Sequence, residues 1–263
     1  MIDPLAVLRA HLAGAVVALD YDGTLAPVVE RPSEAVPAAG AVEVLAALAP
    51  QVRTLALVTG RPAEVVVGLG GLTAVPGLLV LGQYGAQRWS GGEVSTPPAL
   101  PGVAVARRAL PPLLAPEGAE LEDKGISLVV HTRPAPDPPG ALDRLAPAVA
   151  AVAAEAGLEL HPGRLVLELR PPGYDKRRAL LSLCEPRPSA VLFAGDDLGD
   201  VAAYDAVDEL RAGGVPGVLV CSDSEEGPAV LRARADVVVD GPAGVVELLR
   251  SLLSRADRQS EVR

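Results

Sequence analysis

The feature that most constrains this chain is a short apolar run that changes abruptly into acids and a glycine turn, residues 16–25 (VVALDYDGTL). An apolar run of four or five residues closed by turn formers predicts a buried strand of a parallel sheet. The acids then lie at the carboxyl end of that strand. In open α/β sheets this edge binds ligands, because loops from adjacent strands converge there.

The two acids of this stretch, Asp20 and Asp22, are separated by one residue and point the same way in an extended segment. Two carboxylates that share a site repel each other unless a cation lies between them, and a hard divalent ion such as Mg²⁺ prefers such oxygen ligands. An EF-hand is excluded because position twelve counted from Asp20 is Arg31. The chain also has no glycine-rich loop ending in Gly-Lys-Ser/Thr that would hold a nucleotide phosphate.

Composition and charge exclude several classes of protein. The 263 residues are 49% apolar but only 2% aromatic, which suits a core of Val, Leu and Ala between parallel strands and helices. A net charge of −10 argues against a nucleic-acid partner and favours metal ions or small polar ligands. The amino terminus has no basic leader and no apolar run reaches membrane-spanning length, so we expect a cytoplasmic protein without a membrane partner.

The order of predicted elements indicates a parallel core with an insertion. Apolar strands are expected at 16–19, 54–58, 78–81, 190–194, 218–221 and 236–239, with helices at 4–12, 38–48, 175–184 and 243–253. Between them, proline-rich segments flank two helices (103–114, 141–156) and four alternating strands (120–124, 127–132, 158–161, 165–169). We therefore predict a core domain over 1–98 and 171–263 and an α+β domain over 99–170. The polar residues 255–263 are expected to fray.

Polar clusters follow three of these strands. They are Asp20-Tyr21-Asp22, Thr59-Gly60-Arg61 and Asp196-Asp197, and Lys176 opens a helix next to the sheet. Because parallel strands place their carboxyl ends on one edge, these groups are expected to meet around one ligand. Lys176 and Lys124 are the only lysines among 23 basic residues, which suggests positions where a compact ammonium is needed.

In this order the clusters resemble the haloacid dehalogenase superfamily and, within it, the trehalose-6-phosphate phosphatases. The resemblance covers most of residues 16–205, and its motifs are the stretches 20–25 (DYDGTL), 59–61 (TGR), 82–85 (GQYG), 122–125 (EDKG), 131–133 (HTR), 168–176 (ELRPPGYDK) and 195–200 (GDDLGD). It implies an α/β fold: a Rossmann-like parallel-sheet core of the haloacid dehalogenase type with an inserted α+β cap domain.

The resemblance also implies a Mg²⁺-dependent phosphatase that releases trehalose from trehalose 6-phosphate. Asp20 would be the nucleophile that forms an aspartyl phosphate, and Asp22 the acid and base. Thr59 and Lys176 would hold the phosphoryl oxygens, and the neighbouring Gly60 and Arg61 would also bind the substrate. The implied Mg²⁺ ligands are Asp20, the main chain of Asp22, Asp196, and one of Asp197 and Asp200, the other supporting it by a hydrogen bond.

The inserted domain would select the sugar and exclude water from the site. By similarity, its candidate substrate contacts are Lys124, Arg133, Arg164 and Glu168. The implied partner is therefore a phosphorylated sugar, and we expect a monomer.

Three departures from the family pattern leave alternatives open. Tyr84 and Gln87 replace the usual His and Glu of the third motif, and Gly199 falls within a last motif that lacks the usual Thr and Asp-Glu. The chain is therefore either a trehalose-6-phosphate phosphatase, a phosphatase for another phosphorylated sugar or glycerate conjugate, or a sugar-phosphate-binding regulatory protein with weakened catalysis. Retention of both Asp20 and Asp22 argues against the last, because a pure binder needs neither a nucleophile nor an acid.

Overall fold

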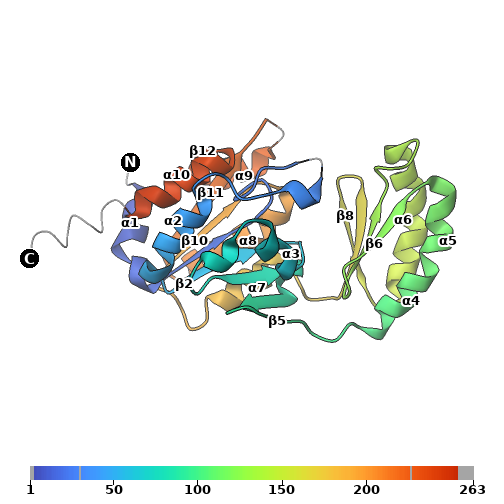
Figure 1. The fold of residues 1–263 in the computed structure, drawn as a ribbon, viewed down its shortest axis with the longest axis horizontal. Coiled ribbons are helices and arrows are strands. Elements are labelled where there is room, and N and C mark those ends of the chain that lie inside the picture. Colours follow the sequence, from blue (N-terminus) through green and yellow to red (C-terminus); the bar gives the residue numbers. More distant parts are fainter. Residues whose placement is uncertain (1–2, 30, 226, 254–263) are drawn as a thin grey trace, which may run out of the picture. The chain divides into compact units, whose positions relative to one another are not determined.

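The computed structural model describes residues 3–29, 31–225 and 227–253 and divides into two compact units (Figure 1). Unit 1 is Met1–Ser95 with Asp175–Arg263, and unit 2 is Thr96–Tyr174. The sequence places the insertion at 99–170, so the compact unit begins and ends a few residues outside that range. The tail expected to fray, residues 255–263, lies outside the described residues.

Unit 1 is built on an eight-stranded sheet with the order β12-β11-β10-β1-β2-β3-β4-β5. Its first six strands are parallel. In sheet order these are β12 (Val237–Asp240), β11 (Gly217–Asp223), β10 (Ala190–Gly195), β1 (Ala15–Leu19), β2 (Thr54–Val58) and β3 (Leu79–Gly82). The predicted α/β fold with a parallel core sheet is confirmed.

Helices cover both faces of this sheet. Val17 and Leu19 of β1 belong to one apolar cluster and Val16 and Ala18 to the other, as the two-residue period of a strand requires. The first cluster is covered by α1 (Pro4–Ala10), α2 (Ala41–Leu48), α3 (Ala63–Leu69) and α10 (Gly241–Leu253). The second is covered by α7 (Lys176–Leu183), α8 (Val201–Ala212) and α9 (Ala229–Arg234). Both faces of β1 are therefore dry, and its charged groups begin only where the strand ends.

Two antiparallel strands extend the sheet beyond β3, and the sequence pattern does not indicate them. They are β4 (Gln87–Ser90) and β5 (Glu93–Ser95). Trp89 is the buried residue of β4, and the other residues of both strands are mostly polar. Neither strand therefore has the apolar run or the sustained alternation that marks a strand in a sequence.

Unit 2 has an antiparallel sheet with the order β6-β7-β9-β8 and helices on one face. Its strands are β6 (Glu120–Asp123), β7 (Leu128–His131), β8 (Glu159–Gly163) and β9 (Val166–Arg170), and its helices are α4 (Pro101–Ala109), α5 (Pro111–Leu114) and α6 (Pro138–Glu155). The single helix expected at 103–114 is divided at Leu110, because the following prolines lack the amide donors that would continue it. Leu128, Val130, Leu167 and Leu169 face the helices, so the alternate residues of the sheet form its other face.

Within residues 3–29, 31–225 and 227–253, no helix is both long and apolar enough to cross a lipid bilayer.

Candidate active site

The carboxyl ends of three neighbouring strands place the predicted groups at one edge of the unit 1 sheet. β1 lies between β10 and β2, and Leu19 is in register with Ala194 on one side and Leu57 on the other. The residues that follow these positions are Asp20, Asp196 and Thr59. The amide of Asp20 donates to the carbonyl of Ala194 at 2.9 Å, which continues the β1–β10 pairing to Asp20, the predicted nucleophile.

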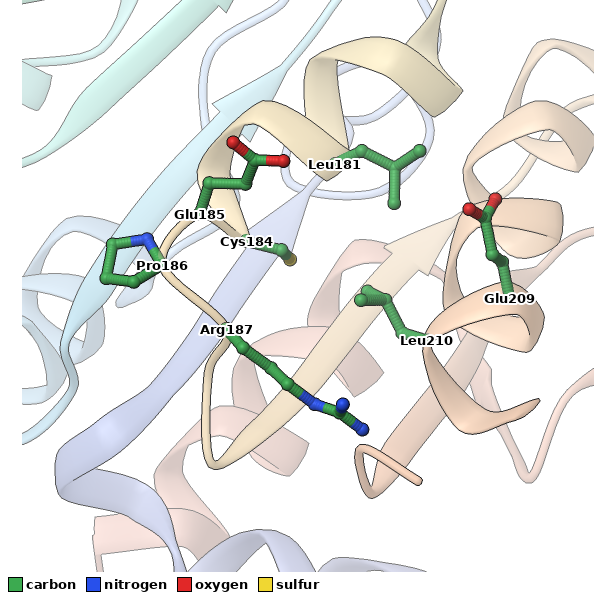
Figure 2. A pocket seen from close by; sticks show the side chains of 7 residues that line it. All are labelled: Leu181, Cys184, Glu185, Pro186, Arg187, Glu209 and Leu210. Atoms are coloured by element: carbon green, nitrogen blue, oxygen red, sulfur yellow. The ribbon is translucent and has the colours of Figure 1, made fainter. Parts of the chain in front are cut away.

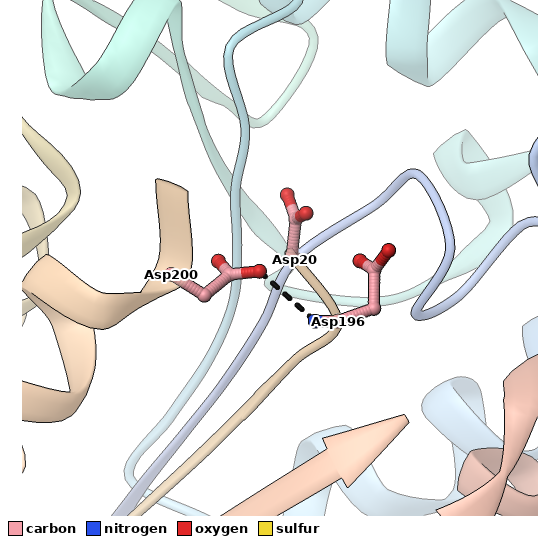
Figure 3. A group of neighbouring side chains, drawn as sticks. All are labelled: Asp20, Asp196 and Asp200. Atoms are coloured by element: carbon pink, nitrogen blue, oxygen red, sulfur yellow. Dashed lines mark hydrogen bonds between the residues drawn. The ribbon is translucent and has the colours of Figure 1, made fainter. Parts of the chain in front are cut away.

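An acidic cluster lies at this edge (Figure 3). One carboxylate oxygen from each of Asp20, Asp196 and Asp200 lies within 4.8 Å of the others. Asp20 and Asp200 are buried, and Asp196 is half-buried. Three carboxylates this close together, two of them buried, repel one another unless protons or cations lie among them.

The electrostatics of the cluster follow from burial and mutual repulsion. Burial raises the pKa of Asp20 well above its usual range, Lys176 lowers it, and Asp200 raises it further. Burial, followed by Asp200 and Asp197, raises the pKa of Asp196 to about 7. These three carboxylates therefore favour a bound cation, because a cation removes the repulsion among them.

Lys176 supplies one positive charge to the cluster. Its ammonium nitrogen lies 2.9 Å from an oxygen of Asp20 and 2.7 Å from an oxygen of Asp200. Burial alone would lower the pKa of Lys176, but Asp20 and Asp200 raise it above its usual value, so the lysine remains charged. Lys176 is the first residue of α7, and the Asp175 side chain caps that helix by accepting from the Arg178 amide at 2.6 Å. The structure thus brings together the predicted Lys176 and Asp20.

Asp200 and Asp197 differ in their surroundings. Besides Lys176, Asp200 accepts bonds from the amides of Asp196 (3.0 Å) and Asp197 (3.2 Å). Asp197 is exposed, and its carboxylate caps the turn at Leu198–Asp200 by accepting from the Gly199 amide at 2.8 Å. Asp200 therefore belongs to the cluster and is held by three hydrogen-bond donors, the Lys176 ammonium and two loop amides, whereas Asp197 shapes the loop.

Asp22 and Arg61 form an ion pair next to the cluster. The Nε and Nη2 groups of Arg61 donate to the two carboxylate oxygens of Asp22 at 2.6 and 2.7 Å. The Arg61 amide also donates to the Thr59 hydroxyl oxygen at 3.1 Å, and Thr59 is buried. The hydroxyl proton of Thr59 can then be donated elsewhere.

Three contacts at the site each involve a residue that is not among the predicted site residues. The Thr24 hydroxyl donates to an oxygen of Asp196 at 3.1 Å, and the Ser222 hydroxyl donates to the carbonyl of Gly23 at 2.7 Å. Gly23 has φ +73°, and a side chain there would meet the Asp196 carboxylate at 2.0 Å. Glycine in the Asp-x-Asp-Gly stretch thus allows both the turn and the close approach of Asp196. The sequence signal for Ser222 is only that it directly follows the apolar run at 218–221.

The loop after β3 contacts the Thr59-Gly60 segment. The Tyr84 amide donates to the Thr59 carbonyl at 2.9 Å, and the Tyr84 ring lies against Gly60, where a built Cβ would come within 2.7 Å of the phenol. Tyr84 adopts the left-handed conformation (φ 58°), which non-glycine residues rarely occupy. Gln87 accepts from the Ala63 amide at 2.9 Å and so supports the start of α3. Tyr84 and Gln87 are the two residues of this motif that differ from the family pattern. Of the two, Tyr84 lies beside the predicted phosphate-binding segment.

The acidic cluster fits a hard divalent cation. Its donors are all carboxylate oxygens, which is the donor type that Mg²⁺ prefers. Asp20 and Asp196 are the better placed ligands, because the oxygens of Asp200 accept bonds from Lys176 and from two amides. A magnesium ion here would be held by few protein groups and would keep several waters, as that ion commonly does.

The helix-free face of the unit 2 sheet carries two of the predicted substrate contacts close together. Lys124 and Glu168 form an ion pair at 3.3 Å, and Arg170 lies on the same face with its Nε 4.0 Å from the other oxygen of Glu168. The three side chains are 9–14% exposed. Arg170 is not among the sequence-predicted residues, although it follows Glu168 by two and therefore shares its face.

The other two predicted contacts lie at the opposite end of this sheet. Arg133 follows β7, Arg164 lies in the turn between β8 and β9, and both are exposed. The Thr132 amide donates to the Leu165 carbonyl at 3.0 Å, which joins these two segments. Lys124 instead belongs to the turn between β6 and β7, beyond Leu128, and β7 is about 10 Å long at 3.4 Å per residue. The ion pair of Lys124 and Glu168 is thus separate from the segments that carry Arg133 and Arg164.

Unit 1 also contains a pocket that none of the acidic-cluster residues lines (Figure 2). Its lining residues are Leu181, Cys184, Glu185, Pro186, Arg187, Glu209 and Leu210. The 184–187 segment precedes β10, whereas Asp196 follows it, so the pocket lies at the amino end of a six-residue strand about 17 Å long. It contributes none of the predicted site residues.

Comparison with known sequences identifies the family. The family model for trehalose-phosphatase matches residues 18–236. A Mycobacterium tuberculosis protein described as an uncharacterized glycosyl hydrolase is 35% identical over 206 residues, which cover 73% of this chain and 15% of that protein. Trehalose-phosphate phosphatase of Mycobacterium avium is 32% identical over 263 residues, which cover 92% of this chain and 63% of that protein. The chain thus spans less than two thirds of the length of these relatives.

A solved structure shares the fold. The C-terminal domain of C. albicans trehalose-6-phosphate phosphatase superposes with a TM-score of 0.77 and 20% identity over 96% of this chain and 97% of that chain. At this identity the likeness shows the fold alone. The family match covers the sheet edge with its acidic cluster as well as the whole of unit 2. The chain belongs to the trehalose-phosphatase family.

Proposed function

We propose that the chain is a Mg²⁺-dependent phosphatase that converts trehalose 6-phosphate to trehalose and phosphate. The observation that carries the proposal is the group of Asp20, Lys176, Asp196 and Asp200, buried except for the half-buried Asp196, at the end of neighbouring parallel strands. A structural ion pair would need one acid and one base, but this group has three acids, so it also suits a cation and a phosphoryl group. Family membership favours trehalose 6-phosphate as the ester.

In the proposed reaction Asp20 attacks phosphorus, and the bond between phosphorus and the sugar oxygen breaks. Asp22 gives a proton to that oxygen, which leaves as the sugar hydroxyl. In the second step Asp22 takes a proton from water, the water oxygen bonds to phosphorus, and the bond to Asp20 breaks to release phosphate. The buried ammonium of Lys176 and the hydroxyl of Thr59, with the main chain at Gly60, stabilise the charge on the transferring group.

Asp20 and Asp196, with the main-chain oxygen of Asp22, would hold Mg²⁺. When bound, the ion would supply positive charge that offsets the phosphoryl oxygens. We assign Asp200 the supporting role, because it already accepts from Lys176 and two amides, and Asp197 the capping of the adjoining turn.

The polar face of unit 2 is proposed to bind the sugar. Lys124 and Glu168 are paired and nearly buried, and together with Arg170 they offer both donors and acceptors for hydroxyl groups. Arg133 and Arg164 lie on two adjoining segments at the other end of this sheet, and we assign them to a second part of the substrate. Alanine at Lys124 or Glu168 should then raise KM for the sugar ester more than KM for a small aryl phosphate.

Phosphate release tests the function directly. With Mg²⁺, the unmutated protein should release phosphate from trehalose 6-phosphate at least about 100-fold faster than from glucose 6-phosphate, as differential recognition of the second sugar allows. Chelation of Mg²⁺ or Asp20→Asn should abolish release. Comparable rates on both esters would instead favour a phosphatase for another phosphorylated sugar, an alternative motivated by Tyr84 beside Gly60. Binding of trehalose 6-phosphate without turnover would favour the regulatory alternative.

A further inference from the structure

The carboxylate of Asp22 is held in one orientation by Arg61. Both oxygens accept from the guanidinium, at 2.6 and 2.7 Å, in the two-point geometry that is the strongest form of this pair. Asp22 follows β1 and Arg61 follows β2, so the pair joins the loops of two adjacent strands at the site edge. The Arg61 and Asp22 side chains are 17% and 36% exposed, which limits screening by water.

Arg61 is itself fixed by groups that have no role in the chemistry. Its Nη1 donates to the carbonyl of Pro32 at 2.6 Å, and its guanidinium carbon lies 5.8 Å from the ring centre of Tyr21. Tyr21 is fully buried, and its hydroxyl donates to the carbonyl of Ala35 at 2.6 Å. With Nε and Nη2 on Asp22, all three guanidinium nitrogens have acceptors. The arginine is therefore built into the loops around it and does not act as an open anion-binding fork.

We propose that Arg61 is a positioning residue for Asp22 and determines how well the protein acts on esters with poor leaving groups. The inference rests on the proposed function. As Asp22 gives its proton to the sugar oxygen it becomes a carboxylate, and Arg61 holds that carboxylate in place and offsets its charge. A sugar alkoxide needs this proton in order to leave, whereas p-nitrophenolate leaves as the stable anion. Loss of Arg61 should therefore slow hydrolysis of the sugar phosphate and leave hydrolysis of p-nitrophenyl phosphate nearly unchanged.

The test compares two esters in single turnover, with protein in excess and saturating Mg²⁺. Trehalose release from trehalose 6-phosphate and p-nitrophenol release from p-nitrophenyl phosphate report the first step alone. Arg61→Gln should slow trehalose release by about 100-fold, within the range of general acid catalysis, and p-nitrophenol release by less than about 3-fold. Arg61→Lys, which cannot donate at two points in one plane, should fall between the two. Asp22→Asn should show the same selectivity as Arg61→Gln.

Arg53→Gln is the matched control, because Arg53 is also an anchoring arginine of unit 1. It donates to the carbonyls of Pro186 (2.5 Å) and Leu183 (2.8 Å), which precede β10 and lie away from the acidic cluster. This variant should lower the melting temperature without changing the ratio of the two rates. Inhibition by inorganic phosphate separates positioning from substrate binding, and its inhibition constant should stay within about 2-fold in Arg61→Gln.

Equal slowing of both esters in Arg61→Gln, or weaker phosphate inhibition that matches the loss of rate, would overturn the inference and leave the proposed function standing. An unmutated protein that hydrolyses neither ester would overturn the proposed function, and this inference with it.

Discussion

At the scale of single residues, small side chains decide how closely the groups of the site approach one another. Gly60 shows this most clearly, because a Cβ there would lie 2.7 Å from the Tyr84 phenol. Tyr84 is held by its amide on Thr59 and by a left-handed backbone, so it cannot move away without strain. The segment that we propose to hold phosphate is thus shaped by the side chain that distinguishes this chain from the family pattern.

Gly60→Ala should lower phosphatase activity by about 10-fold or more, because a shift of the segment by a fraction of an ångström misplaces the phosphoryl contacts. The double variant with Tyr84→Ala should recover activity, since it removes the clash. Gly68→Ala is the control, because nothing lies within 4 Å of the added Cβ and the residue is in helix α3, where alanine is favoured by about 1 kcal/mol. Additive losses in the double variant would show that the Gly60–Tyr84 contact is unimportant.

The residue scale is also where sequence reasoning ends. Asp20, Asp196, Thr59 and Lys176 could be predicted to share an edge, because each follows or precedes an apolar element whose direction is known. The pairing of Asp22 with Arg61 could not, because it depends on side-chain rotamers and on the distant Pro32 carbonyl. Ser222 and Arg170 were missed for the same reason, since burial of a polar residue is decided by the neighbours it receives on folding.

At the scale of elements, helix α7 connects fold stability to the site. Its first residue is Lys176, and its cap is Asp175, which accepts from the Arg178 amide at 2.6 Å. A capping side chain of this kind stabilises a helix by about 1 kcal/mol. It also fixes the direction in which the side chain of the first helical residue, Lys176, projects from the backbone.

Asp175→Ala should therefore lower the free energy of unfolding by about 1 kcal/mol. It should also lower activity several-fold, because the backbone that positions the Lys176 ammonium is no longer held by the cap. Asp3→Ala is the matched control, since Asp3 caps α1 by accepting from the Leu5 amide at 3.0 Å and lies in an element without site residues. Denaturant unfolding and phosphate release measure both effects. If the two variants lose activity equally, the cap of α7 has no specific role at the site.

Elements were predictable where they carry a clear apolar pattern. The strand at 54–58 and the strand from 190 are continuous apolar runs, and both occur as expected. Strands β4 and β5 extend the sheet with mostly polar residues, and β5 has three residues. Such strands depend on pairing with a neighbour that is already formed, and pairing has no local signal.

At the scale of the whole molecule, the acidic cluster should make stability depend on Mg²⁺. The pKa of Asp196 is raised to about 7, so the folded chain holds the proton of this carboxyl more tightly than the unfolded chain does. Without a cation, stability is therefore lost as pH rises from the unfolded value near 4 through about 7. An ion that binds only the folded chain restores it, by about 2.7 kcal/mol at a concentration 100 times its dissociation constant.

Addition of Mg²⁺ at pH 8 should thus raise the melting temperature of the unmutated protein, and Asp196→Asn should remove that rise. With a chelator present, Asp196→Asn should melt no lower than the unmutated protein, because asparagine keeps an acceptor for the Thr24 hydroxyl but has no charge. Glu64→Gln, an exposed acid on α3, is the control and should keep the full response. A Mg²⁺ response that survives in Asp196→Asn would place the ion elsewhere.

The most direct test of the account is the identity of the group that carries phosphate during turnover. The protein is mixed with trehalose 6-phosphate and Mg²⁺, quenched in acid and treated with borohydride, which converts an aspartyl phosphate to homoserine. Mass spectrometry of the peptide that contains residues 16–25 should then show homoserine at Asp20 and an unchanged Asp22, and Asp20→Asn should show neither homoserine nor phosphate release. Homoserine at another position, or phosphate release by Asp20→Asn, would contradict it.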